Sequence, residues 1–139
     1  MTIDEFKIQY ALGSLSDDMK KQLTYGSNTP IEILAVLSKD EYWGIRHAVA
    51  SNMNTPIEIL ETLSEDKDDW VRSSVAENRN TPSKTLKMLS KDKYHRVRKY
   101  VAGNLNTSPE VLQQLSTDEN EYVRYYVRYN ITNNPNYTE

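Results

Sequence analysis

The feature that most restricts the fold of this 139-residue chain is a 26-residue period. Four copies follow one another without a gap. Nine of their 26 columns are identical: an asparagine, a threonine, two leucines, a serine, an aspartate, an arginine, a valine and a second asparagine. The copies occupy residues 28–53, 54–79, 80–105 and 106–131. Self-similarity at such a period is typical of solenoids, in which each unit packs only on its neighbours.

Imperfect copies flank these four repeats. Residues 1–27 form a degenerate first repeat, and residues 132–139 form a C-terminal tail. The matched apolar pairs are Leu12 with Leu34, Leu15 with Leu37, Met19 with Ile45, and Leu23 with Val49. Terminal repeats are expected to be atypical because one of their sides faces water. We therefore predict a single domain, 1–139.

Each copy predicts two short helices. Thr29 is expected at the N-cap of the first helix, followed by Pro30 at the first helical position. Glu32, three residues after the threonine, completes a capping box. Leu34 and Leu37 then lie one turn apart and give this helix an apolar face.

The second helix carries two β-branched residues four positions apart, in most copies beside a small alanine that permits close helix approach. These residues are Ile45/Val49/Ala50, Val71/Val75/Ala76, Val97/Val101/Ala102 and Val123/Val127. Asn52, Asn78 and Asn104 are expected to end the second helices, since asparagine tolerates a left-handed backbone. Helices of about 8–10 residues are marginal alone, so stacking must bury a shared seam. The predicted fold is an all-α solenoid of about five two-helix repeats, α or 3₁₀, without strands.

The repeat resembles the leucine-rich repeat variant family, a relative of HEAT-like α-solenoids. The resemblance covers roughly residues 16–135 and depends on Val71-Arg72, Val75-Ala76, Asn78, Asn80-Thr81-Pro82, Leu86, Leu89-Ser90 and Asp92. It implies a right-handed superhelix of alternating α- and 3₁₀-helices and no common enzymatic activity. Some members carry a cysteine-rich iron–sulfur region. This property does not carry over, because the chain has no cysteine.

Composition excludes several further classes. Without cysteine there is no disulfide, thiol nucleophile, Cys-ligated zinc or iron–sulfur cluster. No cofactor or metal is expected. The charged N-terminus does not resemble a signal peptide, and no apolar run is long enough to cross a membrane, so we expect a cytoplasmic protein. Its richness in asparagine, lysine and tyrosine weakly suggests an AT-rich bacterial or phage gene.

Two charged columns recur in every copy. They are Arg46, Arg72, Arg98 and Arg124, and Asp40, Asp66, Asp92 and Asp118. The arginines could form a ladder for phosphate groups. We favour ion pairs between each arginine and an aspartate of its own or the next repeat, because binding sites vary between repeats and scaffolding does not.

No catalytic constellation is visible, and we predict a non-enzyme. His47 and His95 occupy different repeat positions, without a serine or cysteine partner in the sequence. Paired acids such as Asp68-Asp69 are expected in solvated turns. The two asparagine columns are expected to cap helices and form turns rather than bind amides.

Positions that vary between copies become rich in tyrosine toward the C-terminus, and the chain has ten tyrosines. Tyrosine and tryptophan are common at binding hot spots. The candidate partner-binding residues are Tyr100, Tyr125, Tyr126, Tyr129, Lys99, Trp43 and Trp70. We therefore predict a non-catalytic protein–protein interaction module, an adaptor or a stoichiometric inhibitor. The alternative is that the last tyrosines only cap the final repeat.

A second alternative is contact with nucleic acid. The only basic cluster is Lys91, Lys93, Arg96 and Lys99, interleaved with tyrosines. Such a mixture can hold a nucleic-acid backbone. One repeat is a short footprint, however, and the net charge of the chain is −3, so this function is the less favoured one.

Overall fold

The computed structural model describes residues 1–137, and these residues form ten α-helices and no strand. The degenerate first repeat contains α1 (Ile3–Ala11) and α2 (Asp17–Tyr25). The first helices of the four full repeats are α3 (Ile31–Leu37), α5 (Ile57–Leu63), α7 (Ser83–Leu89) and α9 (Pro109–Leu115). Their second helices are α4 (Trp43–Ser51), α6 (Asp69–Glu77), α8 (His95–Gly103) and α10 (Glu121–Asn133). The predicted all-α tandem-repeat fold is confirmed.

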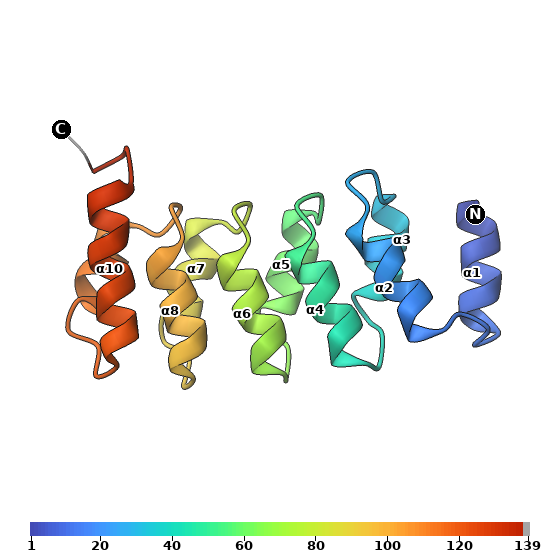
Figure 1. Ribbon diagram of the computed structural model, residues 1–139, viewed down its shortest axis with the longest axis horizontal. Coiled ribbons are helices and arrows are strands. Elements are labelled where there is room, and N and C mark those ends of the chain that lie inside the picture. The colour runs from blue at the N-terminus through green and yellow to red at the C-terminus, as the bar shows by residue number, and fades with distance from the viewer. Residues whose placement is uncertain (138–139) are drawn as a thin grey trace.

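The helices form two layers in an elongated molecule. Helices α2, α4, α6, α8 and α10 lie side by side in one row, and α3, α5 and α7 lie behind them (Figure 1). The termini are at opposite ends of the row. Neighbouring second helices pack directly on one another, whereas each first helix contacts mainly second helices. Every repeat therefore buries its apolar face on the next, as expected for a solenoid.

The predicted apolar seam is present. The two leucine columns and the paired β-branched columns are buried in all four full repeats, and so are three alanines beside them. The alanines are Ala50, Ala76 and Ala102. These residues form one continuous core cluster. The side chains of each repeat are therefore shielded from water by the neighbouring repeats.

The predicted threonine N-caps are wrong. Pro30 occupies the N-cap position of α3, and no described side chain caps this helix. The threonine hydroxyls instead donate backwards, to a carbonyl at the end of the preceding second helix. The bonds are Thr55 to Val49 (2.5 Å), Thr81 to Val75 (2.6 Å) and Thr107 to Val101 (2.5 Å). A buried helix end needs partners for its last carbonyls, and the threonine supplies one.

The asparagines after the second helices also act differently from the prediction. Asn52, Asn78 and Asn104 do end their helices, but with extended backbones (φ −72°, −63° and −77°) rather than left-handed ones. Each side-chain amide donates to two carbonyls of the preceding repeat; Asn78, for example, bonds the Ala50 and Asn52 oxygens at 2.8 and 3.1 Å. Each Oδ1 accepts the N–H two residues on. This asparagine column therefore forms a ladder of hydrogen bonds that links each repeat to the preceding one.

The first repeat departs from the sequence alignment. Leu12, aligned with the buried Leu34, is 75% exposed, because α1 ends at Ala11 and the chain then turns at Gly13 with a φ of 65°. Met19 is exposed as well. Phe6 is fully buried and fills the core at this end instead.

The last repeat also differs. Helix α10 continues to Asn133, so the predicted tail, 132–139, begins inside a helix; its residues 138–139 lie outside the described part of the chain. Asn134 is buried, and the Tyr137 hydroxyl donates to the Thr107 oxygen at 2.9 Å. The tail thus folds back onto the final repeat. All ten described helices are α, so the 3₁₀-helices implied by the family resemblance are not found.

Candidate partner-binding surface

Three of the four arginines of the column form the predicted ion pairs, each with the aspartate of the next repeat; the prediction is wrong for Arg124. The Nε–Oδ2 distances are 2.7 Å for Arg46–Asp66, 2.6 Å for Arg72–Asp92 and 2.8 Å for Arg98–Asp118. In each pair Nη2 also donates to Oδ1, at 3.1–3.2 Å, so the guanidinium grips the carboxylate with two bonds. Nη1 donates to loop carbonyls of its own repeat. These three guanidinium groups are therefore occupied by the scaffold.

The first aspartate of the column has no arginine before it. Lys20 takes that place, with its Nζ 2.9 Å from Asp40 Oδ2, and the Tyr10 hydroxyl donates to the same oxygen at 3.0 Å. Burial alone would raise the pKa of Asp40. Hydrogen bonds from Lys20, the Tyr42 N–H and Tyr10 outweigh burial and hold this pKa below its ordinary value. The alignment of the repeats with one another does not identify Lys20 as the counterpart of the arginines.

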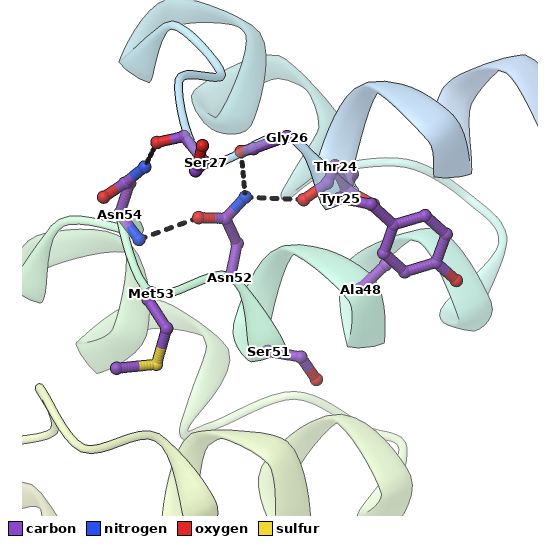
Figure 2. Close-up of a pocket in the computed structure, with 9 residues that line it drawn as sticks. All are labelled: Thr24, Tyr25, Gly26, Ser27, Ala48, Ser51, Asn52, Met53 and Asn54. Carbon is purple, nitrogen blue, oxygen red and sulfur yellow. Dashed lines mark hydrogen bonds between the residues drawn. The ribbon is translucent and has the colours of Figure 1, made fainter.

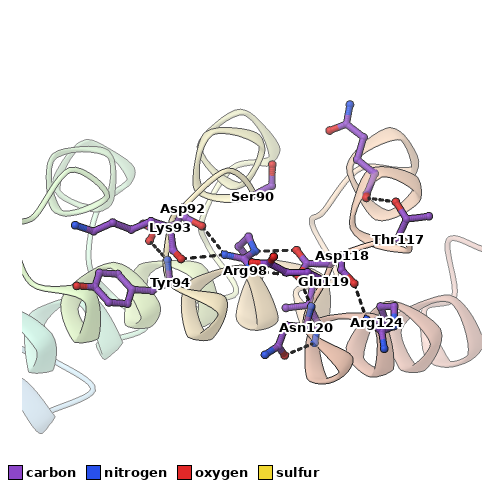
Figure 3. Close-up of polar contacts among 12 residues, drawn as sticks. Ser90, Asp92, Lys93, Tyr94, Arg98, Thr117, Asp118, Glu119, Asn120 and Arg124 are labelled. Atoms are coloured by element: carbon purple, nitrogen blue, oxygen red, sulfur yellow. Dashed lines mark hydrogen bonds and ion pairs between the residues drawn. The ribbon is translucent and has the colours of Figure 1, made fainter.

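The last arginine of the column, Arg124, has no aspartate after it. Its Nη1 donates to the Asp118 carbonyl oxygen at 2.6 Å, as the other arginines donate to their own loops (Figure 3). None of residues 1–137 accepts a hydrogen bond from its Nε or Nη2. Lys20 and Arg124 thus mark the two ends of the ion-pair ladder.

The aromatic candidates lie along the row of second helices in two groups of contacts. We call this set the aromatic belt: Trp43, Trp70, Lys99, Tyr100, Tyr125, Tyr126 and Tyr129. Trp43 and His47 are in edge contact, with ring centroids 6.1 Å apart. His47 Nδ1 is 3.3 Å from the Trp70 carbonyl oxygen. The guanidinium of Arg96 then lies 3.6 Å from the Trp70 ring centroid, which links α6 to α8.

The belt ends in a tyrosine cluster on α8 and α10. Lys99 Nζ lies 4.8 Å from the Tyr100 ring centroid and 5.8 Å from that of Tyr126. Tyr126 is in edge contact with Tyr125, at 5.5 Å, and is 6.4 Å from Tyr129. Tyr125 and Tyr129 are 54% and 52% exposed, whereas Tyr100 and Tyr126 are half-buried against the core. The cluster therefore has anchored rings and exposed rings.

A glycine explains how one of the anchored rings fits. A Cβ on Gly103 would lie 3.0 Å from the Tyr126 Cδ1 atom, which is tighter than ordinary contact. The small residue in α8 therefore lets the Tyr126 ring lie flush against the preceding repeat. The other copies have Ser51, Glu77 and Tyr129 at this position, and this variation alone does not predict the contact.

The prediction that His47 has no serine partner is wrong. Ser74 Oγ lies 2.6 Å from His47 Nδ1, because stacking brings together residues about one repeat apart. Ser74 is buried and also donates to the Trp70 carbonyl at 3.2 Å. No carboxylate among the described residues bonds the histidine. The pair has neither an exposed hydroxyl nor an orienting acid, both of which nucleophilic catalysis by such a pair needs.

The basic cluster does not form one free surface. Arg96 is paired with Asp69 at 2.7 Å and stacked on Trp70. Lys99 lies over the tyrosines, and Lys93 Nζ lies 5.2 Å from the Tyr94 ring centroid in the turn before α8. In the part of the chain that the structure describes, Lys91 makes no ion pair. The cations are therefore divided between that turn and the aromatic belt.

The hollows on the described part of this molecule are open, and several lie between repeats. Figure 2 shows one of about 270 Å³ at the ends of α2 and α4. There the Asn52 amide donates to the Thr24 and Gly26 oxygens, and Asn54 donates to the Ser27 oxygen. These polar groups already bond across the junction between repeats.

Within residues 1–137, no three acidic or histidine side chains converge as a metal site would require. No helix in that range has the length and apolarity to cross a membrane.

Comparison of the chain with models of protein families, with curated proteins and with solved structures gives no match.

Proposed function

We propose that this chain is a non-catalytic protein-binding module that contacts its partner through the tyrosine cluster of the aromatic belt. The observation that carries this proposal is the pair of half-exposed rings, Tyr125 and Tyr129, supported from below by the anchored ring of Tyr126. Rings held in this way can bury a large area while losing little conformational entropy.

The surrounding contacts support the same function. Lys99 gives the cluster a charged centre that is already close to two rings, so little reorganisation is needed on binding. Trp70 remains 45% exposed under Arg96 and extends the surface toward α6. A rigid strip of this kind suits an adaptor or a stoichiometric inhibitor that covers a site on another protein.

We also propose that the chain is a member of the leucine-rich repeat variant group. The support is the repeat motif together with the stacking of two-helix units, which the structure contains. The α-helical first helices would then be a local departure from the alternating α/3₁₀ pattern implied for that group.

The proposed function is tested with a Tyr125→Ala/Tyr129→Ala variant. A partner recovered from a lysate of the source organism is purified, and its direct binding to the full chain is measured by calorimetry. Loss of two exposed hot-spot rings is expected to weaken binding about tenfold or more. Tyr25→Ala is the matched control, because Tyr25 is 72% exposed at the other end of the row. Equal affinity of the double variant and the wild type would refute the proposed surface.

A further inference from the structure

The ion-pair ladder leaves one carboxylate-binding fork open. Three arginines show how the fork works: Nη1 donates to a loop carbonyl of the same repeat, and Nε with Nη2 grips an aspartate of the next. Arg124 keeps the first of these bonds, to the Asp118 oxygen at 2.6 Å (Figure 3). This bond holds the guanidinium, and no described residue occupies its Nε and Nη2 side. The fork is preorganised for a planar carboxylate.

A second arginine lies one helical turn further along the same helix. Arg128 is exposed and stands where the preceding copies have the buried alanines Ala50, Ala76 and Ala102. This substitution places a second cation on the outer face of α10. Neither Arg124 nor Arg128 forms an ion pair with an acidic residue among residues 1–137. The Asp118 carboxylate is close enough to Arg124 for this charge to help lower the pKa of Asp118, but it is already paired with Arg98. Two adjacent guanidinium groups in no ion pair of their own favour an anionic ligand.

The exposed tyrosines adjoin Arg128 and share α10 with Arg124. An open hollow of about 210 Å³ on α10 is lined by Tyr125, Arg128, Tyr129, Thr132 and Asn133. Arginine and tyrosine are both enriched at protein-binding hot spots. The outer face of α10 therefore combines a carboxylate fork, a second cation and two exposed rings.

We infer that the outer face of α10 receives an acidic segment of a partner protein, one of whose Asp or Glu carboxylates occupies the Arg124 fork. This inference depends on the proposed function and names the chemistry of the partner. The three internal Arg–Asp pairs favour a carboxylate over a phosphate. Asp40, the first aspartate of the column, is already held by Lys20 and Tyr10, so it is not available to the Arg124 fork of a second copy.

The inference is tested with a capped synthetic peptide of the sequence Ser-Thr-Asp-Glu-Asn-Glu-Tyr, residues 116–122 of this chain. Its aspartate is the one that occupies the Arg98 fork. The peptide is titrated to millimolar concentration into the full ¹⁵N-labelled protein, and the arginine Nε–H resonances are followed by NMR. We expect a saturable shift of the Arg124 signal. The enclosed Arg46 and Arg72 signals, which are already in ion pairs, should stay in place.

Two controls establish the chemistry. A peptide with Asp118→Asn should bind up to about fivefold more weakly, as loss of an exposed ion pair implies. Arg124→Gln should abolish the shift of the Arg128 signal, whereas Tyr25→Ala, an exposed change at the other end of the row, should leave the Arg124 and Arg128 shifts as in the wild type. An unmoved Arg124 signal, or equal binding of both peptides, would overturn the inference. So would a stronger response to a single-stranded dT oligonucleotide, which would indicate nucleic acid, or a shift with protein concentration alone, which would indicate a second copy.

These outcomes are separate from the test of the proposed function. That test reads the affinity of a purified partner for the tyrosine variant, whereas this one reads an arginine resonance in the presence of a defined peptide. A partner whose affinity depends on Tyr125 and Tyr129, together with an Arg124 signal that ignores the peptide, would retain the proposed function and remove only the acidic-segment inference.

Discussion

The buried asparagine ladder predicts that Asn78→Ala destabilises the solenoid strongly, although it removes only one small amide. The side chain donates to the Ala50 oxygen at 2.8 Å and to the Asn52 oxygen at 3.1 Å, and it accepts from the Asn80 N–H at 2.9 Å. Asn78 is 4% exposed, so water does not replace these bonds in the folded protein. The Asn78 side chain thus joins two repeats, and all of its bonding partners are backbone atoms.

The size of this destabilisation follows from the hydrogen bonds that each partner of Asn78 keeps in the variant. The Ala50 carbonyl at the end of α4 receives no other hydrogen bond from the described residues, and leaving it buried costs about 1–3 kcal/mol. The Asn52 carbonyl still accepts from the Thr55 N–H at 3.1 Å, so its loss is small. The Asn80 N–H loses an acceptor worth about 1 kcal/mol. The expected decrease in the free energy of unfolding is about 2–4 kcal/mol.

The assay is urea denaturation followed by the circular dichroism of the helices. Asn28→Ala is the matched control, since Asn28 is exposed and its side chain bonds no described residue; its effect should be within about 0.5 kcal/mol. Asn78→Asp should be worse than Asn78→Ala, because it places a carboxylate against two carbonyl oxygens. A loss below about 1 kcal/mol for Asn78→Ala would refute the view that this column holds the repeats together.

Three further outcomes are expected. Leu63→Ala, in the buried seam, should cost about 2–5 kcal/mol and cause a cooperative loss of helix on thermal denaturation, and an unchanged melting curve would contradict the stacked core. Arg72→Ala leaves a buried carboxylate unpaired and should cost about 3 kcal/mol, whereas Arg124→Ala should cost less than about 1 kcal/mol in the same urea titration. Burial would raise the pKa values of Asp40 and Asp118, but hydrogen bonds from Lys20 and Arg98 lead the effects that lower them. Their stabilising contribution is therefore present at neutral pH and is lost as the pH falls below the unfolded value of about 3.9, so urea midpoints that stay constant from pH 7 to pH 3 would contradict it.

The 26-residue period was sufficient to predict the fold and its core. Because the period is conserved along the chain, a residue such as Leu60 and its counterpart Leu86 must lie in equivalent environments, and both are fully buried. The same logic predicted that Arg72 would pair with an aspartate of its own or the next repeat. The structure selects the next one, Asp92. Columns that recur together without variation were correctly assigned to the scaffold.

The direction of individual hydrogen bonds could not be predicted from local sequence. Thr55 fits an N-cap motif, but its hydroxyl donates to the Val49 carbonyl at the end of the preceding helix, which also accepts from the Asn52 N–H. Contacts between repeats were missed for a related reason. His47 and Ser74 are 27 residues apart and seem unrelated in the sequence, although one stacking step makes them neighbours. Comparing each residue with the positions 26–28 later would have found this pair.

The division between invariant and variable columns also explains where a binding surface can form. The invariant polar side chains form hydrogen bonds inside the molecule: arginines bond aspartates, and threonines and asparagines bond the carbonyls at helix ends. Few of their hydrogen-bonding groups remain free until the ladder reaches α10. There Arg124 retains the internal bond but lacks an aspartate, and Tyr125 and Arg128 replace the smaller residues found in most earlier copies. Of the residue types that hold one repeat to the next, the arginine is therefore the one that lacks its aspartate at the last repeat, whereas Asn130 still bonds the preceding repeat.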